Sequence, residues 1–269
     1  MTNQTAKYDQ KTLSDFINIP SKIKGVKKII AIASAKGGVG KSTIACNLAI
    51  ACQLSGINTA LVDADIYGPS IANLMKLKNK PELINNLFIP IISNDVKCIS
   101  LGNIIDDNQA GIWRGPMITK ILSQLITAVN WNYDDQEVDL MIIDMPPGTG
   151  DVYLTIAQRF PLAGVILIST PQTVAVIDTV KSIDCFQKLK IPIIGIIQNM
   201  SFYQIGDQKK YLFGKDKAKE MAKKFDLNFL GEIAIHEEIS QANELQQSFI
   251  INNSNIDATK LLIEIAKKL

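Results

Sequence analysis

Short apolar runs separated by longer amphipathic segments mark most of the chain after residue 26. The runs are rich in β-branched residues and are bounded by turn residues, at 27–33, 58–64, 96–102, 138–145, 163–170, 191–199 and, more weakly, 228–234. Because they are almost continuously apolar rather than alternating, they are typical of strands buried on both faces of a parallel sheet.

Segments with a helical period lie between these runs, at 42–56, 118–130, 174–189 and 217–225, and another, 256–269, ends the chain. The alternation predicts an α/β fold, with a doubly wound, mostly parallel sheet and helices on both faces. We see no internal repeat and no linker rich in Pro or Ser. We therefore expect an N-terminal arm over 1–26 and a single domain over 27–269, with the last helix docked on that domain.

Composition narrows the class of protein. The 269 residues are 47% hydrophobic, and 28 basic against 26 acidic residues leave a net charge of +2, which argues against a general nucleic-acid binder. No apolar run reaches the roughly 18 residues of a membrane span. The first residues, MTNQTAKYDQ, are polar and contain no apolar signal core. We expect a cytoplasmic protein with no membrane partner.

The four cysteines are Cys46, Cys52, Cys98 and Cys185, and no two of them are spaced as CxxC. We expect reduced, mostly buried thiols rather than a disulfide framework. His236 is the sole histidine. A single histidine in a predicted loop carries no metal or catalytic pattern, so we assign it no role.

The segment ASAKGGVGKST, residues 33–43, joins a predicted strand to a predicted helix, which is the context of a phosphate-binding loop. Backbone N–H groups and the helix N-terminus would surround the phosphates, with Lys41 on the β- and γ-phosphates and Ser42 on Mg²⁺. Thr43 would bond the α-phosphate. The predicted nucleotide-binding residues are Ala35, Lys36, Gly37, Gly38, Val39, Gly40, Lys41, Ser42 and Thr43.

The second lysine of this loop, Lys36, has two interpretations. It is either a solvated surface charge, or it reaches across to a nucleotide bound by a facing subunit, in the role of an arginine finger supplied in trans. The residues alone leave both interpretations open.

Acidic residues end two of the predicted strands, where open α/β sheets bind their ligands. Asp63 and Asp65 follow one strand, and neighbouring acids there can hold Mg²⁺ or the attacking water. Asp144 ends another in a Walker B arrangement. We therefore predict Ser42, Asp65 and Asp144 as metal ligands, and Lys36, Lys41 and Asp65 as catalytic residues.

Two further features adjoin this predicted site. Gly148 and Gly150 would allow a switch segment that senses the γ-phosphate, with Asp151 beyond it. The carboxamide of Asn199, at the end of the 191–199 run, suits an adenine edge, although it could equally cap a turn.

AKGGVGKST resembles the deviant Walker A motif of the MinD/ParA class of P-loop ATPases. That resemblance implies that Lys36 acts across an ATP-sandwiched dimer. VDADIYGPS, WRGPM, DMPPGTGD and NMSFY resemble the Mrp/ApbC family of iron–sulfur cluster carrier ATPases, over about 25–245. The resemblance implies a homodimeric ATPase that binds a cluster at its interface, passes it to apo iron–sulfur proteins and works with cluster-assembly proteins. It also favours the adenine role for Asn199.

One departure concerns the cargo. In that family the stretch after NMS carries a CxxC that binds the cluster, whereas NMSFYQIGDQKKYLFG, residues 199–214, contains no cysteine. We also expect the N-terminal accessory domain of many relatives to be absent. Two alternatives stay open, a MinD/ParA-like positioning ATPase and an ATPase-fold interaction protein without cluster cargo. Co-sedimentation with vesicles or DNA would reveal the first, and a lack of ATP binding would support the second.

Overall fold

The structure is a computed structural model that describes residues 22–65, 68–104, 121–123 and 125–269. Of Asp151 and Val152 only the backbone is described. Most of the predicted N-terminal arm and the WRGPM motif lie outside these residues. In the part of the chain that is described, no helix is long and apolar enough to cross a membrane.

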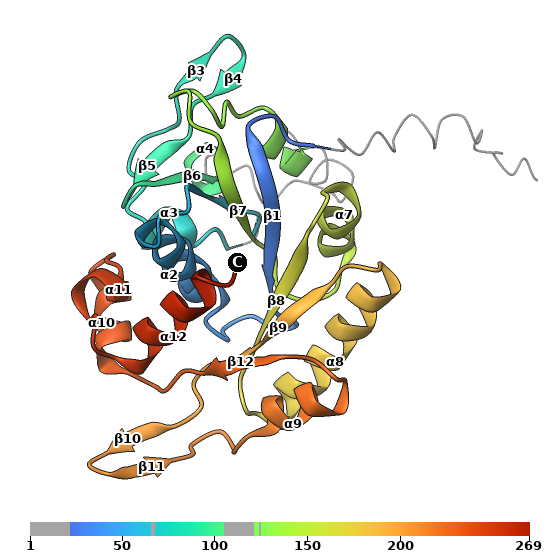
Figure 1. Cartoon of the computed structure of the whole chain (residues 1–269), viewed down its shortest axis with the longest axis vertical. Helices are drawn as coiled ribbons and strands as arrows, with labels where there is room; N and C mark the ends of the chain where they lie inside the picture. Colours follow the sequence, from blue (N-terminus) through green and yellow to red (C-terminus); the bar gives the residue numbers. More distant parts are fainter. Residues whose placement is uncertain (1–21, 66–67, 105–120, 124) are drawn as a thin grey trace, which may run out of the picture.

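An eight-stranded sheet lies at the centre of the molecule, in the order β12-β9-β8-β1-β7-β2-β6-β5 (Figure 1). Each neighbouring pair is parallel except β5 and β6, which are antiparallel. The strands are β1 (Val26–Ala33), β2 (Thr59–Asp63), β5 (Ile91–Ser93), β6 (Val96–Ser100), β7 (Val138–Asp144), β8 (Gly164–Ser169), β9 (Ile193–Gln198) and β12 (Phe229–Glu232). The predicted, mostly parallel sheet is confirmed.

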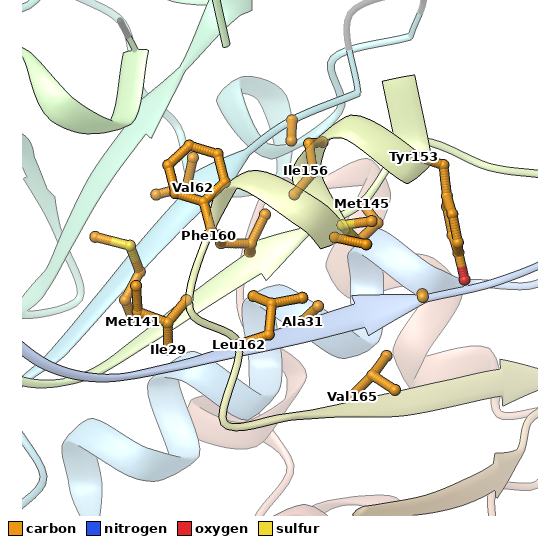
Figure 2. Packing of buried hydrophobic residues seen from close by; sticks show 14 of the residues in the cluster. Ile29, Ala31, Val62, Met141, Met145, Tyr153, Ile156, Phe160, Leu162 and Val165 are labelled. Carbon is orange, nitrogen blue, oxygen red and sulfur yellow. The ribbon is translucent and has the colours of Figure 1, made fainter. Parts of the chain in front are cut away.

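The central strands are apolar throughout because both faces of the sheet are covered. Along β1, Ala31 and Ala33 belong to one buried apolar cluster, whereas Ile30 and Ile32 belong to the other. Figure 2 shows the first cluster, in which side chains of β1, β7 and β8 pack beneath Phe160. The alternation of faces within a continuous apolar run is the reason that the run predicts a doubly covered strand.

Helices cover both faces, as a doubly wound fold requires (Figure 1). One face carries α2 (Lys41–Leu54), α3 (Ile71–Leu74), α10 (Glu237–Glu244), α11 (Phe249–Asn252) and α12 (Asp257–Ala266), and the other carries α7 (Asp151–Arg159), α8 (Thr173–Lys188) and α9 (Lys217–Lys224). The terminal helix α12 packs on α2 with Leu262 fully buried, which confirms that it docks on the domain.

The structure differs from the sequence-based expectation in its short elements. The predicted strand 96–102 stops at Ser100 because α4 (Leu101–Ile104) begins at the next residue. Two hairpins were not predicted: β3 (Leu83–Ile84) with β4 (Leu87–Phe88), and β10 (Tyr203–Ile205) with β11 (Gln208–Lys210). The second hairpin lies within the cysteine-free stretch 199–214. Of the predicted helix 118–130, residues 118–120 and 124 are outside the described part.

Candidate nucleotide-binding site

The carboxyl ends of the central strands bring the predicted site residues to one edge of the sheet. In the parallel register, Asp144 of β7 lies beside both Ile32 of β1 and Asp63 of β2. The phosphate loop follows β1 directly, so the loop and both acidic strand ends meet there. Asn199 reaches the same edge after β9, where its backbone N–H donates to Ser169 O at 2.8 Å.

The loop closes on the first residues of α2. Lys41 Nζ lies 2.6 Å from one carboxylate oxygen of Asp144, and Ser42 Oγ donates to the other at 2.5 Å. Both Lys41 and Asp144 are buried. Burial raises the pKa of Asp144 above its ordinary value, and the charge and hydrogen bond of Lys41 oppose that rise. The lysine and hydroxyl that nucleotide chemistry requires are therefore held together by one carboxylate.

Asn199 braces the phosphate loop from the neighbouring part of the sheet. Its Nδ2 donates a hydrogen bond to Val39 O at 2.8 Å. The backbone of Gly40 has φ of 84°, and a Cβ there would lie 2.3 Å from Asn199 Nδ2. Glycine is thus required at this position both by its left-handed backbone and by the close approach of the carboxamide. The predicted contact of Asn199 with adenine stays a prediction.

A pocket of about 580 Å³ opens in front of the loop. It brings together most of the residues predicted from the sequence, namely Lys36, Gly37, Gly38, Gly40, Lys41, Ser42, Thr43 and Asp65. Ala35, Val39, Asp144 and Asn199 do not line it. Val39 instead belongs to the apolar cluster around α2, and Lys36 lies half-buried at the pocket.

Sequence reasoning about single residues missed one wall of this pocket. That wall comes from the loop after β2 and the end of α3, and its residues are Gly68, Pro69, Ser70, Asn73 and Leu74. Pro147 lines the pocket as well. The YGPS and MPPGTG stretches of the sequence combine small residues with turn-forming residues, which indicates loops at this wall. Nothing in those residue types alone shows that they face a nucleotide.

Asp63 is the second acid near the end of β2, and its environment differs from that of Asp65. Its side chain is completely buried and does not line the pocket. Its carboxylate accepts hydrogen bonds from Asp65 N at 3.1 Å and from Ser100 Oγ at 2.9 Å. Burial, and then the nearby charge of Asp144, raise the pKa of Asp63 to about 7. Asp63 therefore supports the backbone of the Asp65 loop from behind.

The donor chemistry of the site fits Mg²⁺. A hydroxyl and carboxylates are the hard oxygen ligands that this ion prefers. Ser42 and Asp65 line one pocket, and Ser42 also contacts Asp144. These three residues would hold the ion beside bound phosphates.

The cysteines have a different environment from the phosphate site. Cys46, Cys52 and Cys98 are buried, whereas Cys185 on α8 is partly exposed, and all four are free thiols, as predicted. Burial raises the pKa of each thiol. Across the described residues, no group of three or more His, Cys, Asp or Glu side chains could hold a metal ion.

The comparisons with known proteins decide the family. A family model described as NUBPL iron-transfer P-loop NTPase, of the ParA group, matches residues 25–269. The chain belongs to this family. The predicted resemblance to iron–sulfur carrier ATPases is thereby confirmed.

Named members of the family are similar to this chain over most of its length. The iron–sulfur cluster transfer protein NUBPL of Mus musculus is 38% identical over 251 residues, which cover 91% of this chain and 77% of that protein. The iron–sulfur cluster carrier protein of Aquifex aeolicus is 38% identical over 253 residues, covering 92% and 68% respectively.

Solved structures confirm the P-loop NTPase fold of this family member. A nucleotide-binding protein from Archaeoglobus fulgidus, in complex with ADP, superposes with a TM-score of 0.73 at 30% identity, covering 87% of this chain and 91% of that one. The septum site-determining protein MinD of Pyrococcus horikoshii, complexed with Mg-ADP, has a TM-score of 0.66 at 18% identity and coverages of 90% and 95%. At that identity the MinD likeness shows the fold alone.

Proposed function

We propose that the protein binds and hydrolyses Mg-ATP at this site while it carries iron–sulfur clusters to apoproteins. The observation that carries the proposal is the convergence of Lys41 and Ser42 on the buried carboxylate of Asp144, behind a glycine-rich loop that lines an open pocket. The cargo rests on family membership and on the printed names of the relatives.

The chemistry of each group follows from its place in the site. The loop N–H groups and the start of α2 would bind the phosphates, and Lys41 would neutralise their charge. Mg²⁺, when bound, supplies charge neutralisation and orientation of the phosphates. Asp65 lines the pocket, and in this proposal it would orient the attacking water. Lys41 pairs with Asp144 in this structure. To bind a phosphate, Lys41 must therefore give up part of its contact with Asp144.

The second lysine supports a homodimer in this proposal. Lys36 lines the pocket while remaining half-exposed, and its charge acts on Asp178 of α8. The pKa of Asp178 on α8 is lowered chiefly by its hydrogen bond from Lys181, and the charge of Lys36 adds to this. A half-exposed cation at the pocket is suited to the phosphate of a nucleotide bound by a facing subunit, and this supports hydrolysis that depends on the dimer.

The chain offers few cysteine ligands of its own for an iron–sulfur cluster. Three of its cysteines are buried in the core and apart from the cysteine-free segment 199–214. We therefore infer that ligands come in part from the partners, which are apo iron–sulfur proteins and cluster-assembly proteins. Free thiols fit a reducing compartment, for which we propose the cytoplasm.

Calorimetric titration of Mg-ATP tests the nucleotide site. Lys41→Ala removes the central cation and should abolish measurable binding, which would appear as at least a hundredfold rise in Kd. Lys27→Ala is the matched control, because Lys27 is an exposed lysine near the start of β1, the strand that precedes the phosphate loop. Equal affinity in wild type and Lys41→Ala would contradict the proposal.

A further inference from the structure

A buried polar cluster behind the pocket joins the loop that carries Asp65 to the next strand of the sheet. Asp63 Oδ1 accepts a hydrogen bond from Asp65 N, and Asp63 Oδ2 accepts one from Ile71 N, both at 3.1 Å. One carboxylate thus binds the backbone of both Asp65 and the first residue of α3. Ser100, at the end of β6, donates a third hydrogen bond to Asp63 Oδ2 at 2.9 Å.

A second contact connects the same two segments. Ser100 Oγ accepts a hydrogen bond from Gly102 N at 3.1 Å, which fixes the start of α4. A Cβ on Gly102 would lie 3.2 Å from two carbon atoms of Pro69. Since Pro69 lines the nucleotide pocket, the start of α4 and the pocket wall are in direct contact.

The cost of this arrangement indicates that it serves more than stability. Asp63 is a completely buried carboxylate beside Asp144, and Asp144, not Asp63, has the lysine as its 2.6 Å partner. Burying a second negative charge next to the first is unfavourable. In return, Asp63 fixes the distance between Asp65 and the first residue of α3, Ile71.

We propose that Asp63 is a positioning residue for ATP hydrolysis, which holds the Asp65 loop in its working geometry through Ser100 and the start of α4. This inference rests on the proposed ATPase function. The loop contributes Asp65, Gly68 and Pro69 to the pocket, so a displaced loop moves groups that face the reacting phosphate. The phosphate loop, Lys41 and Ser42 stay in place, and nucleotide binding is therefore retained.

Steady-state ATPase kinetics together with equilibrium ATP binding test the proposal. We expect Asp63→Asn to lower kcat by about ten- to a hundredfold, because misplacements near 1 Å can cost a hundredfold. The Kd for Mg-ATP should stay within about threefold of wild type. Ser100→Ala removes one of the three hydrogen bonds, so its loss of kcat should be smaller and in the same direction.

Gly102→Ala tests the same contact without changing the Asp63 carboxylate or the Ser100 hydroxyl. Alanine is the better helix former, so its local effect on α4 is favourable, while its Cβ presses on Pro69. We expect a lower kcat with a melting temperature close to that of wild type. Thr59→Val is the matched control, because it removes a buried hydroxyl hydrogen bond at the opposite end of the same strand, from Thr59 Oγ1 to Ile57 O.

The outcomes separate this inference from the proposed function. Wild-type kcat in folded Asp63→Asn and Ser100→Ala would overturn the inference, as would losses of kcat no larger than that in Thr59→Val. If Asp63→Asn fails to fold, Ser100→Ala and Gly102→Ala decide in the same way. A wild-type chain without ATPase activity would instead contradict the proposed function.

Discussion

At the scale of single residues, the two lysines of the phosphate loop have different environments. Lys41 is buried and is bound to Asp144, whereas Lys36 is half-exposed and its charge acts on Asp178 of α8. The resemblance to MinD/ParA ATPases, rather than the spacing, implies a separate role for Lys36, and that role stays a prediction. Which role Lys36 performs is a question for kinetics.

Replacing Lys36 separates binding from turnover. We expect Lys36→Ala to leave the Kd for Mg-ATP within about threefold and to lower kcat by roughly a thousandfold, the effect of an arginine finger. Mixing Lys36→Ala with Asp65→Asn subunits should give activity that follows the statistics of shared sites. Full activity in a strictly monomeric preparation would rule out a role across the interface.

Asp63 predicts how the stability of the nucleotide-free protein depends on pH. Its pKa is about 7 in the folded protein, against about 4 in an unfolded chain. Between these values the folded state holds a proton that the unfolded state has released, so stability falls as pH rises from about 4 to 7. Asp63→Asn removes this contribution to the pH dependence of stability.

Urea unfolding of wild type and Asp63→Asn at pH 5, 6, 7 and 8 measures this effect. The midpoint of the variant should rise relative to that of wild type as pH increases to about 7, and the difference should then become constant. Asp144 is present in both proteins, so its own titration contributes to both. Parallel midpoints over the whole range would show that Asp63 does not titrate there.

At the scale of elements, the phosphate loop depends on its brace from the end of β9. Asn199→Ala removes the hydrogen bond to Val39 O, worth about 1 kcal/mol, and should weaken ATP and GTP binding equally if Asn199 acts as a brace alone. A loss confined to ATP would instead show that Asn199 contacts adenine. Titration of both nucleotides distinguishes the two roles.

Gly40→Ala tests the same loop from the other side of this contact. The new Cβ meets Asn199 Nδ2, and the left-handed backbone adds about 1–2 kcal/mol of strain, so nucleotide binding and the melting temperature should both fall. Gly37→Ala is the matched control for folding, because a Cβ there meets nothing within 4 Å. Equal melting temperatures of the two variants would contradict the bracing geometry.

The elements divide clearly into those that the sequence predicts and those that it does not. The buried strands and long helices follow from their apolar pattern, since covering both faces of a parallel sheet leaves continuous apolar runs. The hairpins β3–β4 and β10–β11 have strands of two or three residues, too short for any period to appear. Helix α7, which no pattern predicted, begins directly after Gly150 of the predicted switch segment.

The site shows the same division. Lys41, Ser42 and Asp65 are predictable because the phosphate loop is a local motif and Asp65 follows a buried strand. Asp63 lies two residues from Asp65 and has the same chemistry, so no local pattern distinguishes them. Its true role depends on Ser100, which reaches it through the pairing of β2 with β6.

At the scale of the whole molecule, the central claim is that a complete nucleotide site coexists with an incomplete cluster site. Cys46 and Cys52 are buried on α2 and six residues apart, well over one helical turn of about 3.6 residues, so they are poor joint ligands. Cys185 is the thiol with some exposure among the four. A pair of symmetry-related Cys185 thiolates would supply half of the four that a cluster requires.

Iron counting after anaerobic reconstitution with iron and sulfide, with ATPase activity measured on the same sample, tests that claim most directly. We predict that the isolated protein hydrolyses ATP but retains far fewer than the roughly four irons per dimer of a shared [4Fe–4S] cluster. Stable retention of about four irons per dimer would contradict the claim, and loss of those irons in Cys185→Ser would then identify the ligand.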